Sequence, residues 1–218
     1  MRPVGRLHVI TDTNVQSRYS HLDLAQLALA GGADCIQYRR KSGTTRELIE
    51  EARSLVGICR RANVPLVVND RIDVAIAADA MGVHLGQHDF PLTLAREWMG
   101  PDRIIGGSAS TLEMALEVQK AGADYVGFGA LYTTGSKPDA SAPQGPAALG
   151  EVARALEIPV IAIGGITGGF IEEVMAAGAH GVAVIAAVVS AEDPEAAAAA
   201  LRASINAAQA GPGRGPSR

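Results

Sequence analysis

Two aspartates, Asp70 and Asp89, each follow a short apolar run of the chain, over residues 65–68 and 81–83. A short β-rich run that ends abruptly in polar residues is typical of a buried strand whose C-terminal end opens onto a site. Two carboxylates at neighbouring strand ends could share Mg²⁺, which prefers oxygen ligands and leaves positions open for water and phosphate. Alternatively, Asp70 pairs with Arg71, and Asp89 caps a following helix. Taken together, the two aspartates favour the metal site.

Three polar residues at alternate positions, Gln37, Arg39 and Lys41, follow another apolar run. A period of two would aim their side chains the same way if the strand continues through them. Arginine binds phosphate oxygens as a planar fork and lysine as a point charge, so the two cations could hold a diphosphate. A solvated turn explains the same residues equally well, and the neighbouring Arg40 fits that interpretation.

Two further segments combine glycine with hydroxyl groups. In Gly106-Gly107-Ser108 the backbone could approach a ligand closely, although a tight strand exit explains the glycines equally well. Thr134-Gly135-Ser136-Lys137 lies in a polar stretch from residue 131 to about residue 145. A structureless connection longer than about 12 residues is more often functional or disordered, and this favours a role for the loop.

Apolar runs with strand character alternate along the chain with segments of helical periodicity. We expect strands over residues 6–11, 34–38, 66–68, 82–85, 103–108, 125–129, 160–163 and 182–185. We expect helices over residues 22–30, 45–62, 74–78, 92–99, 111–122, 147–156 and 170–177, and from residue 194 onward. Capping-box patterns open two of these helices, at Thr44–Glu47 and Ser110–Glu113.

Eight alternating strands and helices in about 210 residues predict an α/β fold with a single (β/α)₈ TIM barrel. An open doubly wound sheet is the main alternative. The barrel is favoured because no GxGxxG follows the first strand and because polar clusters end many strands rather than one switch point. We expect one catalytic barrel domain over residues 1–210, and a disordered C-terminal tail over residues 211–218, which is rich in Gly, Pro, Ser and Arg.

In such a barrel the residues after the seventh and eighth strands usually bind phosphate through backbone N–H groups and a helix N-terminus. Here they are Gly164-Gly165-Ile166 and Ile185-Ala186. Two ordinary glycine turns are the alternative. Given the barrel, phosphate binding is the better interpretation.

The charge and the apolar runs of the chain argue against nucleic-acid and membrane partners, and its cysteines favour a reducing compartment. The net charge is −4 and the body of the chain has no basic run, so nothing argues for nucleic acid. No apolar run reaches the roughly 18 residues that a spanning helix needs, and we expect no membrane partner. The two cysteines, Cys35 and Cys59, form no CxxC and resemble small core residues, so a reducing cytoplasm is the expected location. Among the histidines, His84 lies in an expected strand as a hydrogen-bonded core residue, and no spacing pairs a nucleophile with a base.

These motifs together resemble one enzyme family. Gln37-Tyr38-Arg39-Arg40-Lys41 is similar to the QxREK segment of the thiamine phosphate synthases. Four more segments resemble further signatures of that family and occur in its order and spacing. They are Asn69-Asp70-Arg71, His84-Leu85-Gly86-Gln87-His88-Asp89, Gly106-Gly107-Ser108-Ala109 and Ile163-Gly164-Gly165-Ile166. The similarity runs from Leu7 to about Val189.

The resemblance implies a barrel-shaped transferase of thiamine biosynthesis. It would join 4-amino-2-methyl-5-(diphosphooxymethyl)pyrimidine to thiazole phosphate, giving thiamine phosphate and diphosphate. Its partners would be these small phosphate and diphosphate substrates, and its cofactor would be Mg²⁺ on Asp70 and Asp89. The resemblance implies catalytic roles for Arg39, Lys41 and Lys137.

The resemblance also divides the substrate-binding residues into two sets. The pyrimidine diphosphate would be bound by Gln37, Arg39, Arg40, Lys41, Asn69, Ser108 and Lys137. The thiazole phosphate would be bound by Thr134, Gly135, Ser136, Gly165, Ile185 and Ala186.

The chain departs from the family pattern in four places. Arg40 stands where the family has Glu, Ala130 where it has Pro, and Ser136 where it has Thr. Ala186 replaces a Ser beside the thiazole phosphate, so one side-chain hydrogen bond is lost while the backbone N–H remains.

Two other functions are alternatives to the synthase. A thiazole tautomerase relative would carry a His in place of Ala130, and a non-catalytic phosphate-ligand binder would explain Arg40 and Ala186.

Overall fold

Eight parallel strands close into a barrel in chain order, each paired with the next and β1 with β8. The computed structural model describes residues 4–136 and 142–210. The strands are β1 (Leu7–Thr11), β2 (Cys35–Tyr38), β3 (Leu66–Asn69), β4 (Gly82–Leu85), β5 (Ile104–Ala109), β6 (Tyr125–Phe128), β7 (Val160–Ile163) and β8 (Gly181–Val184). The predicted (β/α)₈ barrel is therefore confirmed.

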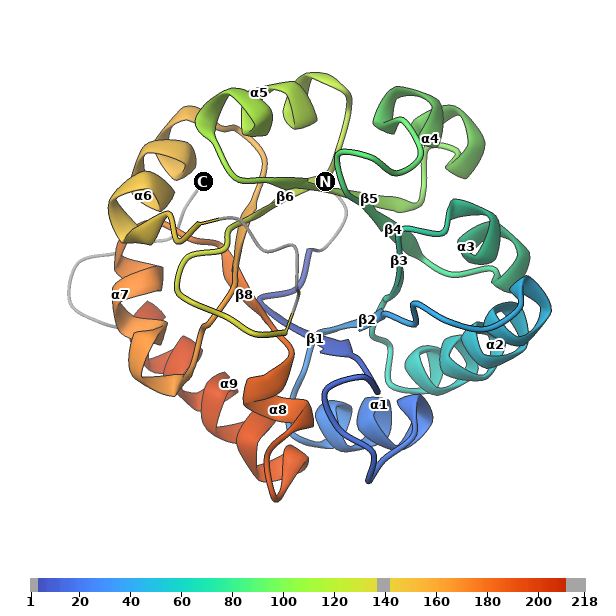
Figure 1. Ribbon diagram of the computed structural model, residues 1–218. Coiled ribbons are helices and arrows are strands. Elements are labelled where there is room, and N and C mark those ends of the chain that lie inside the picture. Colours follow the sequence, from blue (N-terminus) through green and yellow to red (C-terminus); the bar gives the residue numbers. More distant parts are fainter. Residues whose placement is uncertain (1–3, 137–141, 211–218) are drawn as a thin grey trace.

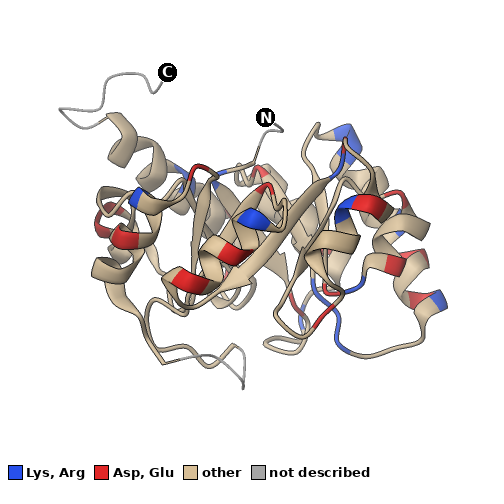
Figure 2. Cartoon of the chain, turned by 90° about the horizontal axis from the view of Figure 1, so that it is seen from above, with Lys and Arg blue, Asp and Glu red and all other residues tan. Residues whose placement is uncertain are grey.

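Helices form an outer ring around the strands (Figure 1). They are α1 (His21–Ala30), α2 (Thr45–Arg61), α3 (Ile72–Ala78), α4 (Leu92–Met99), α5 (Leu112–Lys120), α6 (Gly145–Ala155), α7 (Ile171–Ala176), α8 (Ala186–Val189) and α9 (Pro194–Ala210), with a short 3₁₀ helix η1 (Gly168–Phe170). In the part of the chain that the structure describes, none of them is both long and apolar enough to cross a membrane. Basic and acidic segments are interspersed along the helices (Figure 2).

The structure corrects two details of the predicted elements. Helix α8 was not predicted, because its four residues, Ala186–Val189, are too few to show a helical period. The predicted capping box at Ser110–Glu113 is wrong, because the N-cap is Thr111, whose side chain accepts from the Met114 backbone N–H. The predicted box of α2 is present, with Thr44 and Glu47 bonded reciprocally. The predicted tail over residues 211–218 lies outside the described residues.

Two glycines of the barrel wall make room for large polar side chains inside it. A Cβ on Gly106 would collide with the ring of Tyr125 and approach His84 Nδ1, and a Cβ on Gly127 would lie 2.9 Å from His84 Cε1. Gly107 faces outward, where a Cβ would collide with Val118 of α5. Packing against these side chains thus accounts for the glycines of the Gly106-Gly107-Ser108 segment, without a ligand.

Candidate active site

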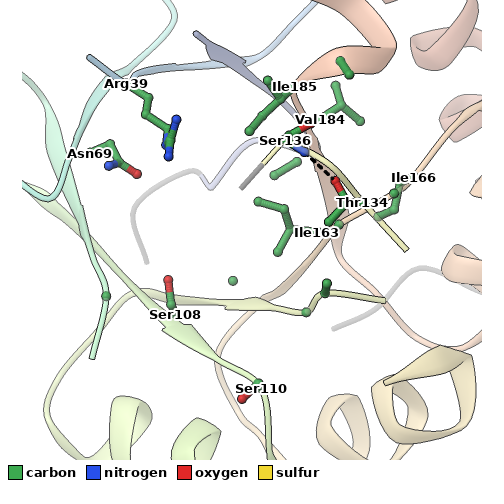
Figure 3. Close-up of a pocket in the computed structure, with 18 of the residues that line it drawn as sticks. Arg39, Asn69, Ser108, Ser110, Thr134, Ser136, Ile163, Ile166, Val184 and Ile185 are labelled. Carbon is green, nitrogen blue, oxygen red and sulfur yellow. Dashed lines mark hydrogen bonds between the residues drawn. The ribbon is translucent and has the colours of Figure 1, made fainter. Parts of the chain in front are cut away.

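A cavity of about 700 Å³ opens where the strands end at their carboxyl side. Residues that follow or end β2 through β8 line it, and active sites of TIM barrels occupy this face. The predicted site residues that line it are Arg39, Lys41, Asn69, Asp70, Asp89, Ser108, Thr134, Gly135, Ser136, Gly165, Ile185 and Ala186. Figure 3 shows Arg39 and Asn69 on one side of the cavity and Thr134 and Ile185 on the opposite side.

Arg39 is held by a buried carboxylate that the sequence reasoning missed. Its guanidinium Nη1 forms an ion pair with Asp12, which follows β1 and has no exposed surface. The Arg39 Nε atom is buried and has no hydrogen-bond partner among the described residues. An orphaned cationic N–H at the wall of a cavity is suited to an anionic oxygen of a ligand. The signal for Asp12 was present, because it is a carboxylate directly after a strand, as Asp70 is.

Lys41, Asp70 and Asp89 form a charged cluster. Lys41 Nζ lies 2.5 Å from Asp70 Oδ2, and the Asp70 and Asp89 carboxyl groups lie beside each other. Burial alone would raise the pKa of Asp70, but its hydrogen bonds to Lys41 and Asp89 lower that pKa below the usual value. Burial raises the pKa of Asp89, and the neighbouring Asp70 carboxylate raises it further. Two acidic side chains that lie side by side at a cavity wall are suited to share a cation.

The backbone holds Asp70 in place. Asp70 has a φ of 64°, in the left-handed region that residues other than glycine seldom adopt, and its backbone N–H donates to the His84 carbonyl oxygen at 2.8 Å. Strained backbone of this kind clusters at functional sites. The conformation turns the chain at the end of β3, directly before α3 begins at Ile72.

The structural alternatives for the two aspartates are both wrong. Arg71 pairs with Asp73 at 2.6 Å rather than with Asp70. Asp89 Oδ2 accepts the Gly86 backbone N–H at 2.6 Å, and helix α4 has no side-chain cap. Both carboxylates therefore remain at the cavity.

The donor set fits a magnesium ion. Within residues 4–136 and 142–210, no group of three or more His, Cys, Asp or Glu side chains gathers that could hold a metal. Mg²⁺ commonly binds proteins through one or two carboxylates and takes its other ligands from water and substrate phosphates. Asp70 and Asp89 match that pattern, because both line a cavity large enough for a phosphorylated substrate.

Ser108 is fixed at the cavity wall from two directions. The Gln87 side-chain N–H donates to its carbonyl oxygen at 2.6 Å, and its Oγ lies 2.9 Å from His84 Nε2. The other ring nitrogen of His84, Nδ1, lies 3.0 Å from the Tyr125 hydroxyl oxygen. His84 is therefore the hydrogen-bonded core residue that was predicted. The fold brings the Ser108 hydroxyl group to His84 across neighbouring strands, a contact that no spacing in the sequence indicated.

The opposite side of the cavity is built mainly from backbone. The chain after β6 lies against the end of β7, with Leu131 N–H donating to Ile163 O at 2.9 Å and Tyr132 N–H donating to Gly164 O at 3.0 Å. Gly165 has a φ of 68°, and a Cβ there would lie 2.6 Å from the Thr133 carbonyl oxygen. Only glycine suits this position without strain.

Hydroxyl groups and a helix start complete this backbone side. Ser136 N–H donates to Thr134 Oγ1 at 3.3 Å, a bond that is drawn dashed in Figure 3. Helix α8 begins at Ala186, immediately after β8, and Ile185 and Ala186 both line the cavity. The residues expected around a thiazole phosphate therefore lie together.

Three residues that were predicted to bind the pyrimidine diphosphate are not among the residues placed at the cavity wall. The side chain of Gln37 is buried deeper in the barrel, beside the Tyr125 hydroxyl group. Arg40 is directed at helix α2, with Nη1 3.1 Å from Glu51 Oε2, and it does not line the cavity. Lys137 lies outside the described residues.

The model of the thiamine monophosphate synthase family matches residues 7–188. The chain belongs to this family. It is 49% identical to the thiamine-phosphate synthase of Salinibacter ruber, over 94% of this chain and 90% of that protein. It is 48% identical to the thiamine-phosphate synthase of Chloroflexus aurantiacus, over 94% of each chain. Its activity is thiamine-phosphate synthesis, the work of a transferase in thiamine biosynthesis.

A solved structure agrees with this membership. The thiamine phosphate pyrophosphorylase of Pyrococcus furiosus superposes with a TM-score of 0.85 at 39% identity, over 93% of this chain and 96% of that one. The superposition covers nearly all of both chains, so the two proteins share the same overall fold.

Proposed function

We propose that the cavity condenses 4-amino-2-methyl-5-(diphosphooxymethyl)pyrimidine with thiazole phosphate, with the diphosphate on the charged side and the thiazole phosphate on the backbone side. The observation that carries the proposal is the juxtaposition of Lys41, Asp70 and Asp89 across one 700 Å³ cavity from Gly165 and Ala186. A diphosphate requires cations and a metal, whereas a monophosphate can be held by backbone N–H groups.

Asp70 and Asp89 would hold Mg²⁺. The ion, when bound, supplies positive charge to the oxygens of the leaving diphosphate. Arg39 and Lys41 supply further positive charge from the protein, and Lys137 is proposed to do the same. Asp12 orients the Arg39 guanidinium, so this cation is in place before the substrate arrives.

The bond between the methylene carbon and the diphosphate oxygen breaks, and diphosphate takes the electron pair. The aminopyrimidine ring delocalises the positive charge left on the methylene carbon. The lone pair of the thiazole nitrogen then forms the new carbon–nitrogen bond. No proton has to move, so leaving-group electrostatics and positioning carry the catalysis.

The test is a coupling assay with both substrates in Mg²⁺ or in EDTA, with thiamine phosphate followed by chromatography. We expect product only with Mg²⁺. Asp70→Asn should lose at least about 100-fold in turnover, as expected for removing a group that stabilises charge in the transition state. The matched control is Asp73→Asn, which removes a nearby carboxylate that pairs with Arg71 outside the cavity, and it should retain activity.

Unchanged turnover in folded Asp70→Asn protein would overturn the metal assignment. Absence of any product from the unaltered protein would overturn the coupling reaction and favour a thiazole tautomerase or a phosphate-ligand binder. Thiazole isomerisation would then be assayed next.

The proposed location is the cytoplasm. Cys35 and Cys59 are both free and buried, and proteins of reducing compartments keep such thiols.

A further inference from the structure

A column of hydrogen-bonded side chains runs from the cavity wall into the barrel core. Ser108 Oγ lies 2.9 Å from His84 Nε2, and His84 Nδ1 lies 3.0 Å from the Tyr125 hydroxyl oxygen. The two rings stack, with centroids 5.4 Å apart and planes inclined by 28°. Three neighbouring strands, β4, β5 and β6, each contribute one member.

The column is rigidly packed. Tyr125 is 1% exposed and His84 is 7% exposed. The space that both rings occupy exists because Gly106 and Gly127 carry no side chain, as described above. Held in this way, the imidazole cannot turn to offer different atoms to Ser108.

The column has a direction, because a neutral imidazole donates from one nitrogen and accepts at the other. If Tyr125 donates to Nδ1, then Nε2 donates to the Ser108 oxygen, and the serine proton is left to point into the cavity. In the opposite direction Ser108 would donate to His84 and present only lone pairs to the cavity. An anionic oxygen can accept but cannot donate, so a bound diphosphate selects the first direction.

We infer that His84 and Tyr125 are positioning residues, which fix the Ser108 hydroxyl group as a hydrogen-bond donor to the diphosphate of the substrate. This inference rests on the proposed function. It also assigns Ser108 a role other than nucleophile, because His84 donates a hydrogen bond to the serine oxygen and does not accept the serine proton.

A double-mutant cycle on the intact enzyme tests the inference. Ser108→Ala should lower kcat by about 100-fold, as expected for the loss of one donor to a developing anion. Tyr125→Phe should lower kcat by about 10-fold and leave the KM for thiazole phosphate unchanged. In the Ser108→Ala background, Tyr125→Phe should have no further effect, since the hydroxyl group that it directs is gone.

The matched control is Tyr38→Phe. Tyr38 is also 1% exposed, and its hydroxyl group donates to Glu51 on the outside of the strand ring, at 2.6 Å. This variant should keep full activity. Such a result would show that the fall in kcat depends on losing the hydroxyl group of Tyr125, and does not follow from losing a tyrosine hydroxyl group elsewhere in the barrel.

The outcomes separate this inference from the proposed function. If Ser108→Ala is inactive but Tyr125→Phe is neutral, or lowers kcat equally in both backgrounds, the inference is overturned and the proposed function stands. If Ser108→Ala itself retains full activity, the assignment of Ser108 to the diphosphate fails, and the inference fails with it.

A second pair of variants applies if Tyr125→Phe does not fold. His84→Gln keeps an amide N–H at the level of Nε2, whereas His84→Met keeps the volume and removes the donor. We expect His84→Gln to retain at least 10 times the kcat of His84→Met, in the range expected for a hydrogen bond to a charged or strongly polar group. Equal kcat values in the two variants would overturn the inference.

Discussion

The two sides of the cavity present different chemical groups to a ligand. The side formed after β2, β3 and β4 uses charged side chains, namely Arg39, Lys41, Asp70 and Asp89. The side formed after β6, β7 and β8 uses glycine backbone, small hydroxyl groups and the start of a short helix. Both sides lie at the carboxyl ends of strands in one barrel, so the contrast does not come from the fold.

The difference shows where each side can tolerate change. The charged side is held by ion pairs, Asp12 with Arg39 and Lys41 with Asp70, so each side chain depends on a partner. The backbone side depends on the path of the chain, and its side chains can vary if that path is kept. This accounts for the position of the departures Ser136 and Ala186, which both lie on the backbone side.

Loss of one cation from the charged side should have the largest effect. Arg39→Met is expected to lower kcat/KM by about 1,000-fold, because hydrogen bonds to charged groups contribute about 1.5–3 kcal/mol each and the guanidinium can make two. Steady-state coupling kinetics measure the change. The control is Arg53→Met, which removes an exposed arginine whose guanidinium donates to the Ala77 carbonyl oxygen, away from the cavity. A loss below about 10-fold would show that the two sides do not differ as described.

A change of backbone on the opposite side should have an intermediate effect. Gly165→Ala places a Cβ 2.6 Å from the Thr133 carbonyl oxygen in a conformation with φ of 68°, so the strand exit must shift. We expect the KM for thiazole phosphate to rise by roughly 10- to 100-fold, in line with a backbone strain of about 1–3 kcal/mol. The KM for the pyrimidine diphosphate should change little.

Gly168→Ala is the matched control for that variant. Among the described residues other than its chain neighbours, no atom lies within 4 Å of a Cβ built on Gly168, and the residue has no left-handed φ. A rise in KM of equal size in both variants would contradict a specific role for the Gly165 backbone.

An added side-chain donor on the backbone side should have the smallest effect. Ala186→Ser restores the hydroxyl group that the family pattern has beside the thiazole phosphate. We expect the KM for thiazole phosphate to fall by about 10-fold, the lower end of the value of a hydrogen bond to a charged group. Isothermal titration with thiazole phosphate gives the same comparison without turnover. Unchanged affinity would mean that the backbone already satisfies the phosphate.

Patterns along the chain predicted the eight strands well, since every expected strand end falls within one residue of the observed one. Alternating and helical patterns show which side of an element carries the apolar side chains, and neighbouring residues alone are enough to define such a pattern. The four-residue helix α8 was missed because one turn carries no period. The cap of α5 was misplaced by one residue because Ser110 and Thr111 are both good N-cap residues.

The candidate site was predictable where residue type alone points to a chemistry. Asp70 and Asp89 could be recognised as carboxylates after strands, and the structure brings their carboxyl groups together. Asp12 was overlooked although it has the same placement, because its partner Arg39 is 27 positions away. Arg40 was assigned to the diphosphate with its neighbours, yet its side chain is directed toward Glu51 of α2.

The sequence by itself determined the class of fold, the family and the residues capable of binding phosphate or a metal. These follow from local spacing and from the chemical types of side chains, which need no knowledge of distant contacts. Only the tertiary structure decided that His84 meets both Ser108 and Tyr125, that Gly106 and Gly127 make room for the rings of His84 and Tyr125, and that Asp12 orients Arg39. Closure of the barrel places residues from separate strands within hydrogen-bonding distance, and pairings of this kind leave no regular spacing in the chain.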